Sequence, residues 1–221
     1  MDIQPLDEDY EERMLQFEVD CNEGKGNAVA CHQVGEFLSV VRNDHDKAAK
    51  VFQKNCKELH HAPSCFNLGR IFLAGKGMKQ SDVEAVKSFD TACKGDHQPA
   101  CYHLGFLLLH GGDGIKQDPK KATKALESSC EGGMADGCHL LATQLLRRDG
   151  KGPVQRNPSR AKLMLERGCE RQHGPSCFNL AVMYKNGDDG VPSDEEKFRV
   201  YKARTQHLVE QYGGLGGIKG A

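Results

Sequence analysis

The stretch Cys65-Phe66-Asn67-Leu68-Gly69 decides the fold, because closely related five-residue stretches recur along the chain at nearly constant spacing. The other four also begin at a cysteine and read Cys31-His-Gln-Val-Gly35, Cys101-Tyr-His-Leu-Gly105, Cys138-His-Leu-Leu-Ala142 and Cys177-Phe-Asn-Leu-Ala181. The intervals between these five cysteines are 34, 36, 37 and 39 residues. A period of this length is typical of solenoid proteins, in which one supersecondary unit is stacked repeatedly along the chain.

The first half of each repeat is predicted to be a helix that starts near the cysteine. Large apolar residues stand three and seven positions after the cysteine, as Leu68 and Phe72 do, and this spacing places them on one helical face. The fourth position is always small, although glycine lowers helix propensity by about 1 kcal/mol relative to alanine. We therefore expect a close helix crossing at these small residues, which are Gly35, Gly69, Gly105, Ala142 and Ala181.

The second half of each repeat is predicted to be a helix that starts at a capping residue. Ser81 and Ser193 each open a Ser-x-x-Glu capping box, and Asp118 and Asn157 each precede a first-turn proline. A small residue followed four positions later by a large one marks the buried face, in the pairs Ala48 and Phe52, Ala85 and Phe89, Ala122 and Leu126, and Ala161 and Leu165. The sequence thus predicts an all-α protein, an α/α solenoid of five antiparallel helix pairs, with helices near 8–22 and 194–211 as terminal caps.

The ten cysteines fall in five close pairs: Cys21 with Cys31, Cys56 with Cys65, Cys93 with Cys101, Cys130 with Cys138, and Cys169 with Cys177. Disulfides between these neighbours would staple the end of one repeat to the start of the next. An alternative pairing within repeats joins Cys31 to Cys56, Cys65 to Cys93, Cys101 to Cys130 and Cys138 to Cys169. That pairing leaves Cys21 and Cys177 without partners, so the even count favours the neighbour pairing. Reduced, buried thiols are a further alternative, because cysteine is small and often buried.

Charge and hydropathy argue against two classes of partner. The chain has 30 basic and 31 acidic side chains, which give no positive excess for nucleic acid or anionic lipid. The longest apolar run, Phe106 to Leu109, is far shorter than the ~20 residues of a membrane-spanning helix. We therefore expect no nucleic-acid partner and no membrane span.

The cysteines also bear on the cellular compartment. Disulfides persist in oxidising compartments, yet the N-terminal residues are acidic and are typical neither of a secretory signal nor of an Arg-rich mitochondrial presequence. The mitochondrial intermembrane space reconciles these observations, because it oxidises small proteins that lack cleavable presequences. We predict this location.

The chain resembles the Sel1-like repeat family, which is related to the tetratricopeptide repeats. The resemblance is carried by Leu68, Gly69, Phe72 and the glycines at 75 and 77, and by residues 85–93. Within that family the chain is similar to the mitochondrial intermembrane-space assembly factors of cytochrome c oxidase, through residues 17–21, 46–51 and 55–65.

This resemblance implies five disulfide-bonded repeats, import by the disulfide relay oxidase, complex IV assembly components as partners, and a capacity to bind haem. The repeat pattern and the glycine content divide the chain into an N-terminal capping helix at 1–22, a Sel1-like solenoid at 23–211 and a flexible Gly-rich tail at 212–221. The repeats within the solenoid are expected near 31–57, 65–94, 101–131, 138–170 and 177–211.

Candidate sites for chemistry are few. No Cys-x-x-Cys, Cys-x-x-Cys-His, His-Glu-x-x-His or Ser-x-x-Lys motif occurs, so we expect no catalytic residues and no metal ligands, and cofactor-binding residues are not assigned. The histidines considered as ligands are His32, His60, His61, His103 and His139. Cys21 and Cys31 form the widest and most terminal pair, with Met14 and Phe17 on the same helical face, which would suit docking to the relay oxidase.

Two alternative functions stay open beside the assembly scaffold. One is a thiol-disulfide oxidoreductase or haem chaperone that uses Cys21 and Cys31. The other is a general Sel1-like adaptor protein in the cytosol or endoplasmic reticulum.

Overall fold

The computed structural model describes residues 8–22, 27–148 and 153–213, and these residues form an all-α protein, as predicted. Apart from two isolated bridges, Gly112 with Ile115 and Asp188 with Val191, no β-structure occurs among them. The helices are α1 (Glu8–Asn22), α2 (Ala28–Glu36) with its π-helical continuation η1 (Phe37–Val41), α3 (His45–Leu59), α4 (Ala62–Ala74), α5 (Asp82–Lys94), α6 (Gln98–His110), α7 (Pro119–Glu131), α8 (Ala135–Leu146), α9 (Pro158–Glu170), α10 (Gly174–Asn186) and α11 (Glu195–Tyr212).

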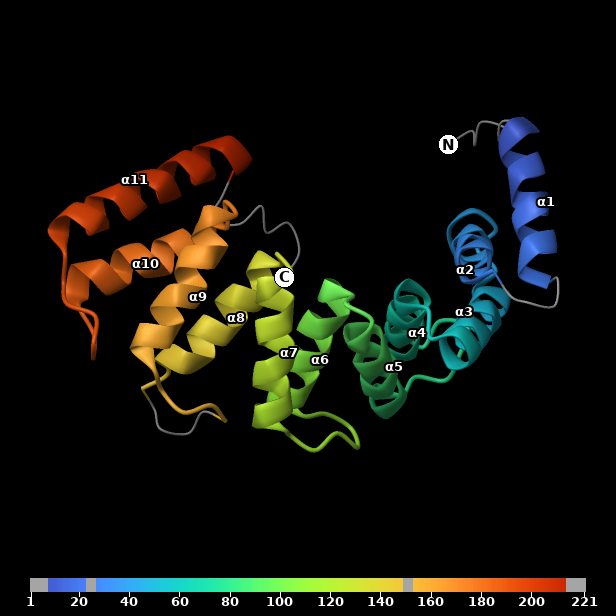
Figure 1. Cartoon of the computed structure of the whole chain (residues 1–221), viewed down its shortest axis with the longest axis horizontal. Helices are drawn as coiled ribbons and strands as arrows, with labels where there is room; N and C mark the ends of the chain where they lie inside the picture. Colours follow the sequence, from blue (N-terminus) through green and yellow to red (C-terminus); the bar gives the residue numbers. More distant parts are fainter. Residues whose placement is uncertain (1–7, 23–26, 149–152, 214–221) are drawn as a thin grey trace. The chain divides into compact units, whose positions relative to one another are not determined.

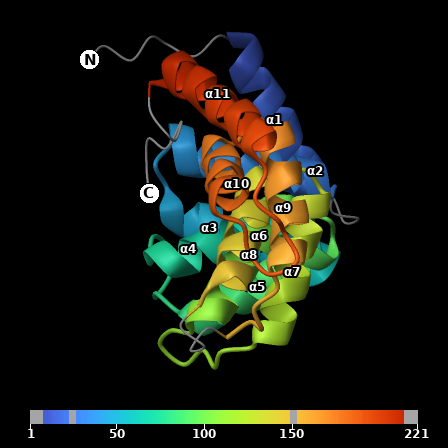
Figure 2. The same ribbon diagram turned by 90° about the vertical axis from the view of Figure 1, so that its left-hand side faces the viewer.

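The chain forms two compact units. Unit 1 comprises Met1–Ala100 and Gly112–Ile115, and unit 2 comprises Cys101–Gly111 and Lys116–Ala221. Within unit 1, α1 packs on α2, α2 on α3, α3 on α4, and α4 on α5 (Figure 1). Within unit 2, α7 packs on α8, α8 on α9, α9 on α10, and α10 on α11. Helices α10 and α11 lie side by side in both views (Figure 1, Figure 2). Within α1–α5 of unit 1 and within α7–α11 of unit 2, helices adjacent in sequence are therefore adjacent in space, as the repeat predicts.

At three repeats a large side chain packs directly against a glycine of the preceding helix: Phe52 against Gly35, Phe89 against Gly69 and Leu126 against Gly105. A Cβ placed on Gly35 would lie 2.5 Å from a ring carbon of Phe52, and one on Gly69 would lie 2.5 Å from a ring carbon of Phe89. Phe52 and Phe89 are almost completely buried. The predicted close crossing is present, and the glycines make room for rings that would otherwise collide with the helix.

Helix caps agree with the sequence at three of four positions. The side chains of Ser81, Asp118 and Asn157 each accept a hydrogen bond from the backbone N–H three residues later. The prediction of Ser193 as a cap was wrong, because α11 is capped by Asp194, whose carboxylate accepts from Lys197 N at 3.0 Å. A carboxylate is a stronger acceptor than a hydroxyl at the positive end of the helix dipole.

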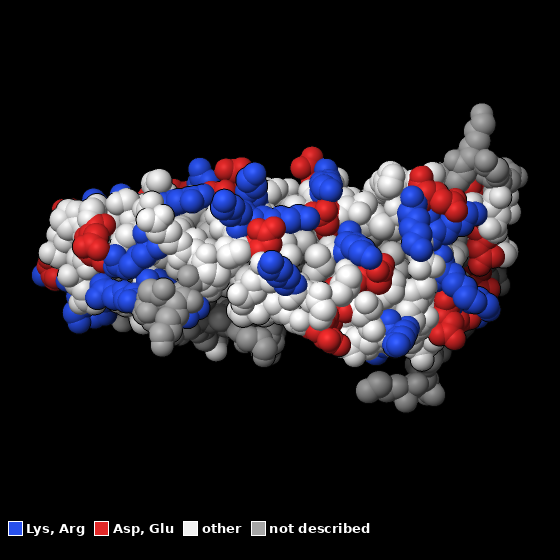
Figure 3. Space-filling model, turned by 90° about the horizontal axis from the view of Figure 1, so that it is seen from below, with Lys and Arg blue, Asp and Glu red and all other residues white. Residues whose placement is uncertain are grey.

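The surface carries both signs of charge in close mixture. On the face drawn in Figure 3, Lys and Arg side chains are interspersed with Asp and Glu, and neither sign dominates. Among the described helices, none combines the length and the apolar character needed to cross a bilayer.

Candidate functional site

Disulfides staple the junctions between repeats. The structure has Cys21–Cys31, Cys56–Cys65, Cys130–Cys138 and Cys169–Cys177 bonds, with Cα–Cα distances of 4.6 to 4.7 Å. Each joins the last part of one helix to the first turn of the next, which is the neighbour pairing and not the alternative within repeats. Cys93 and Cys101 are disulfide-bonded as well, and no free cysteine occurs in the part of the chain that the structure describes.

A left-handed residue turns the chain at four junctions. His60, Asp96, Gly133 and Gln172 have φ values of 49°, 58°, 99° and 62°, and each lies five positions before the second cysteine of its junction. Only one of the four is glycine, although a side chain in this region costs roughly 1–2 kcal/mol. The short corner therefore enforces a strained conformation, which the flanking helices and the staple hold in place.

Replacing Gln172 with glycine is expected to relieve that strain. We expect the free energy of unfolding to rise by about 1 kcal/mol, because glycine adopts positive φ without a steric penalty but loses more entropy on folding. Urea unfolding followed by circular dichroism would measure the change. Gln172→Ala is the matched control, since it removes the same polar side chain and keeps the Cβ. Equal effects of the two substitutions would contradict the explanation from backbone strain.

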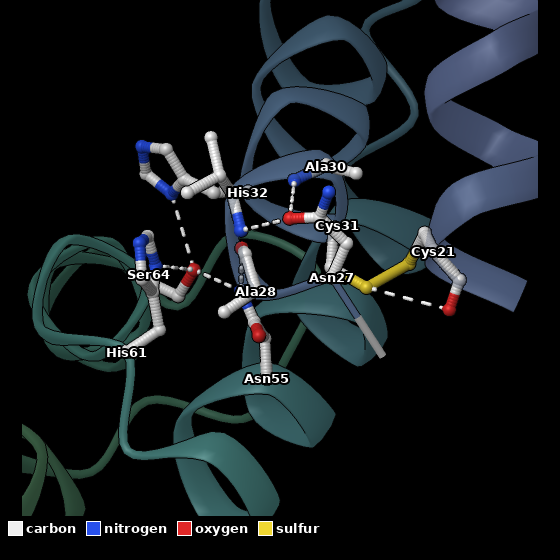
Figure 4. Close-up of a disulfide and its surroundings, with 10 residues drawn as sticks. Cys21, Asn27, Ala28, Ala30, Cys31, His32, Asn55, His61 and Ser64 are labelled. Atoms are coloured by element: carbon white, nitrogen blue, oxygen red, sulfur yellow. Dashed lines mark hydrogen bonds between the residues drawn. A yellow bond between two sulfur atoms is a disulfide. The ribbon is translucent and has the colours of Figure 1, made fainter. Parts of the chain in front are cut away.

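The side chains of Asn55, His32 and His61 all contact the buried hydroxyl of Ser64, near the Cys21–Cys31 disulfide (Figure 4). Asn55 Nδ2 donates to Ser64 Oγ at 2.7 Å and to the carbonyl oxygen of Ala28 at 2.8 Å. The Nδ1 atoms of His32 and His61 lie 3.1 and 3.0 Å from the same hydroxyl oxygen. The cluster thus ties α2 and α3 to the first turn of α4.

The hydrogen bonds of this cluster constrain the two imidazole rings. The Ser64 hydroxyl carries one proton, so it donates to one Nδ1 atom and accepts from the other. His32 Nε2 lies 3.4 Å from Glu36 Oε1, which favours the proton on that nitrogen. His32 Nδ1 is then the acceptor and His61 Nδ1 the donor. Two neutral histidines in opposite tautomers satisfy the network, and a proton on His32 Nδ1 would leave the Ser64 hydroxyl proton without that acceptor.

A corresponding pair occurs in unit 2. His173 Nδ1 lies 2.8 Å from Ser176 Oγ, and His173 Nε2 lies 3.6 Å from Asp136 Oδ1. His139 Nε2 lies 3.2 Å from Asn179 Nδ2. The ring centroids of His139 and His173 are 5.1 Å apart, as are those of His32 and His61. The same repeat positions therefore build a histidine pair in each unit.

Burial makes these histidines hard to protonate. Desolvation lowers the pKa of His32 and, with repulsion from His32, the pKa of His61. Desolvation and the neighbouring His173 lower the pKa of His139 to about 4, although Asp136 acts in the opposite direction. Hydrogen bonding by His173 holds the pKa of Asp136 below its ordinary value. The lowered pKa values favour the neutral form of His32, His61 and His139, which serve as packing and hydrogen-bonding groups.

Acid is expected to destabilise unit 2 through His139. An unfolded histidine titrates near pH 6.5, so between pH 6.5 and about 4 the unfolded chain binds the proton that folded His139 rejects. Stability is therefore fully present above pH 6.5 and falls as the pH is lowered through this window. Urea unfolding at pH 7, 6, 5 and 4.5 would measure the fall. His139→Gln should flatten the pH dependence, and an unchanged slope in that variant would contradict the assignment.

The described residues offer little for catalysis or metal binding. Ser64 and Ser176 are both 0% exposed, so neither hydroxyl can reach a substrate in the folded chain. Among the described residues, no three His, Cys, Asp or Glu side chains cluster in a way that could hold a metal ion. Two other histidines were considered as ligands. His60 is the left-handed residue of a junction, and His103 packs edge-on against Tyr102. The structure thus brings together His32 with His61, and places His60 and His103 elsewhere.

One regularity was missed from the sequence. His61, His97 and His173 each stand four positions before the second cysteine of their junctions. His97 Nδ1 accepts from Ala100 N at 3.3 Å, and His173 Nδ1 accepts from Ser176 N at 3.3 Å. The side chains of His97 and His173 therefore cap the helices that follow them, in the way that serine or asparagine usually does, whereas His61 is an N-cap residue without a side-chain cap bond. Their constant distance from the cysteine was the available signal.

The cysteines differ in exposure. Cys21 and Cys93 are half-buried, whereas Cys65, Cys130, Cys138 and Cys177 are completely buried. Cys31 Sγ lies 3.6 Å from the carbonyl oxygen of Cys21. On the predicted docking face, Met14 is only 5% exposed and Phe17 is half-buried. Docking through Met14 would therefore have to precede the packing of α1 on α2.

Comparison with known proteins gives the family. The Sel1 repeat model matches residues 62–97, 98–134, 135–173 and 174–197, and the four matches start at the first residues of α4, α6, α8 and α10. A solved Sel1 repeat protein from Oxalobacter formigenes superposes with a TM-score of 0.75 at 21% identity, covering 96% of this chain and 91% of that one. This likeness shows the fold.

Two curated relatives align over most of the chain. Cytochrome c oxidase assembly factor 7 of Xenopus tropicalis is 31% identical over 187 residues, covering 82% of this chain and 80% of that protein. Its Homo sapiens counterpart is 33% identical over 184 residues, covering 80% of this chain and 64% of that protein. The chain spans less than two thirds of the human relative and 31% of the Drosophila melanogaster homolog. The chain therefore belongs to the Sel1 repeat family, where its curated relatives include the cytochrome c oxidase assembly factor 7 proteins.

Proposed function

We propose that this chain is an assembly factor for cytochrome c oxidase, and that it acts as a disulfide-stapled, protein-binding scaffold in the mitochondrial intermembrane space. The observation that carries the proposal is the similarity to assembly factor 7 over about four fifths of the chain. The disulfides at the repeat junctions support an oxidising compartment.

The chemistry of the junctions fits a scaffold. The staples and the histidine pairs fix one helix relative to the next, and the serines that the histidines contact are completely buried. Partners are then held by surfaces presented at fixed spacing. The relay oxidase is a transient partner that forms the disulfides, and components of complex IV are the lasting ones.

No haem ligand is assigned among the junction histidines. The Nδ1 atoms of His32, His61 and His173 are engaged with buried serine hydroxyls. A histidine that ligates a metal commonly keeps such a hydrogen bond on its other ring nitrogen, so Nε2 would be the ligand atom. His32 Nε2 already lies 3.4 Å from Glu36 and His173 Nε2 lies 3.6 Å from Asp136. The proposed function includes no step through haem.

Deletion and rescue would test the role. In cells that lack the protein, native gels are expected to show less assembled complex IV with complexes I and III unchanged, and the wild-type chain should restore it. Complex IV at normal abundance in the deleted cells would overturn the proposal.

Protease protection and alkylation would test the location. The chain should resist protease in intact mitochondria, become accessible when the outer membrane is ruptured, and show no alkylated cysteine before reduction. Free thiols, or recovery in the cytosol or endoplasmic reticulum, would favour a general adaptor.

A second candidate function is thiol-disulfide exchange at Cys21 and Cys31, favoured by the partial exposure of Cys21. Redox titration of each pair with mass spectrometry distinguishes the two. Structural staples have reduction potentials below about −300 mV, and a working dithiol has a distinctly higher one. A higher potential at this pair alone would support the oxidoreductase.

A further inference from the structure

A cavity in unit 2 opens between α7 and α9, which are successive second helices of the repeats. It has a volume of about 660 Å³, and residues 153–157, which lead into α9, form a further wall. Pockets that bind small molecules typically measure about 300–1,000 Å³. We refer to this hollow as the α7–α9 cavity.

The lining of the α7–α9 cavity is strongly cationic. Four basic side chains line it, which are Lys120, Lys124, Arg156 and Arg160, and Glu127 is the one carboxylate among the described residues there. Arg160 pairs with Glu127 across the two helices. Lys120 and Lys124 form no ion pair with any residue that the structure describes. The two lysines are therefore available to an anion that enters the cavity.

Arg156 is held at one wall of the cavity by two aspartates. Its Nη1 donates to Asp189 Oδ2 at 2.7 Å, and its Nη2 pairs with Asp188. The Nε atom is buried and has no hydrogen-bond partner in the part of the chain that the structure describes. Buried N–H groups normally have an acceptor, because leaving one unpaired costs free energy. Since Arg156 lines the cavity, a ligand oxygen bound against this wall would supply the acceptor.

The cations stand at helix ends that do not favour them. The other second helices begin with acidic residues, for example Asp46 in α3, Asp82 in α5 and Glu195 in α11. Neither α7 nor α9 has an acidic residue in its first turn, and Lys120 and Arg160 stand there instead. Because the N-terminus of a helix carries a partial positive charge, the helix dipoles add to the positive potential of the cavity.

The rest of the lining is uncharged. It includes Pro119, Pro153 and Val154, which are half-buried, and the polar side chains of Thr123 and Gln155. Proline and valine offer contact to a carbon skeleton, and the hydroxyl and the amide offer hydrogen bonds. The cavity therefore has one part for anionic groups and another for an organic group attached to them.

We infer that the α7–α9 cavity binds a small organic polyphosphate. Arginine binds phosphate oxygens in a bidentate manner and lysine binds them as a point charge, so Arg156, Arg160 and the two lysines recognise the phosphates. The apolar wall at Pro153 and Val154 contacts the organic group. This site lies on the second helices and goes beyond the proposed assembly role, and it is tested on the purified chain without reference to that role.

Isothermal titration calorimetry with the full-length, oxidised chain tests the inference. The probes are inorganic pyrophosphate and ADP, which carry similar charge at neutral pH, and sulfate is the control anion. We expect one saturable site for each probe, at least tenfold tighter than for sulfate and weaker at higher salt. ADP should bind more tightly than pyrophosphate, because its nucleoside reaches the apolar wall. Equal affinity for sulfate and the two probes would overturn the inference, as would ADP binding more weakly than pyrophosphate.

Lysine variants locate the binding. Lys120→Gln/Lys124→Gln should weaken ADP binding at least tenfold. Lys50→Gln/Lys54→Gln is the matched control, because these two lysines are exposed on α3 in unit 1 with the same spacing. Circular dichroism and thermal unfolding would show that both variants stay folded. Unchanged affinity in the cavity variant, or an equal loss in the control, would overturn the inference.

Glu127→Gln gives an expectation of the opposite sign. It removes the carboxylate from the lining and releases Arg160 from its ion pair, so ADP should bind at least threefold more tightly. A damaged fold would weaken binding, so a gain in affinity cannot come from unfolding. Unchanged or weaker binding in this variant, once it is shown to be folded, would overturn the inference.

Sedimentation with vesicles separates a soluble ligand from a lipid headgroup, since both present phosphate. The vesicles are phosphatidylcholine with and without cardiolipin. We expect the chain to stay in the supernatant with both. Co-sedimentation that requires cardiolipin and is lost in Lys120→Gln/Lys124→Gln would overturn a soluble organic polyphosphate as the ligand.

Discussion

Phe89→Ala is expected to lower the free energy of unfolding by about 3–5 kcal/mol, because truncating a buried phenylalanine loses its transfer energy and leaves a cavity. Phe89 is 0% exposed, lies over Gly69, and has its ring centroid 5.9 Å from that of Phe66. Urea unfolding at pH 7 would measure the loss. Lys87→Ala on the exposed side of the same helix is the control and should change stability little.

A second substitution tests the packing explanation. In the wild-type chain, Gly69→Ala would place a Cβ 2.5 Å from a Phe89 ring carbon, and overpacking of this kind costs about 1–3 kcal/mol. In the Phe89→Ala background that obstacle is gone, and alanine is a better helix former than glycine by about 1 kcal/mol. Gly69→Ala should therefore destabilise the wild type and be neutral or stabilising in the variant. Additive effects in this double-mutant cycle would contradict direct packing of the two residues.

Removing the last staple is expected to have the next largest effect. Cys169 and Cys177 are separated by 8 positions, and closing a loop of this length stabilises the folded state by about 2–3 kcal/mol in the chain-entropy account. Cys169→Ala/Cys177→Ala should lose about this amount in urea unfolding under oxidising conditions. Alanine is chosen because both sulfur atoms are buried, and serine would place a hydroxyl there.

Reduction provides the control for this prediction. With dithiothreitol present, the difference between the wild type and the double variant should largely disappear, since both then lack the 169–177 bond. A difference that persists after full reduction would assign the loss to side-chain packing and not to the covalent link.

Much of the fold could be predicted from the sequence because its determinants are local and repeated. The 34- to 39-residue spacing of the cysteines predicted the helix pairs, and the terminal helix predicted near 8–22 matches α1 at Glu8–Asn22. Two observations favoured the neighbour disulfides: each pair spans only a short corner, and this pairing leaves none of the ten cysteines without a partner. Ser193 was predicted as a cap in place of Asp194, since two adjacent residues offered acceptors and the backbone decided between them.

The contacts of the junction histidines could not be predicted from the sequence. His32 and His61 were considered as separate ligands, and their joint contact with Ser64 depends on how one repeat is rotated against the next. The surface hollows between α2 and α4 and between α8 and α10 depend on the same rotation, because each is lined by residues from two repeats.

The sequence by itself determined which residues form the helices, which cysteines stand close enough to bond, and where small residues admit large ones. These features depend on contacts within one repeat or across one short corner, so spacing along the chain is sufficient to predict them. Tertiary structure alone decided which imidazoles share a buried hydroxyl, which carboxylates are already paired, and where two repeats leave a hollow. Those properties depend on distances between side chains of different repeats, and no local pattern in the sequence encodes those distances.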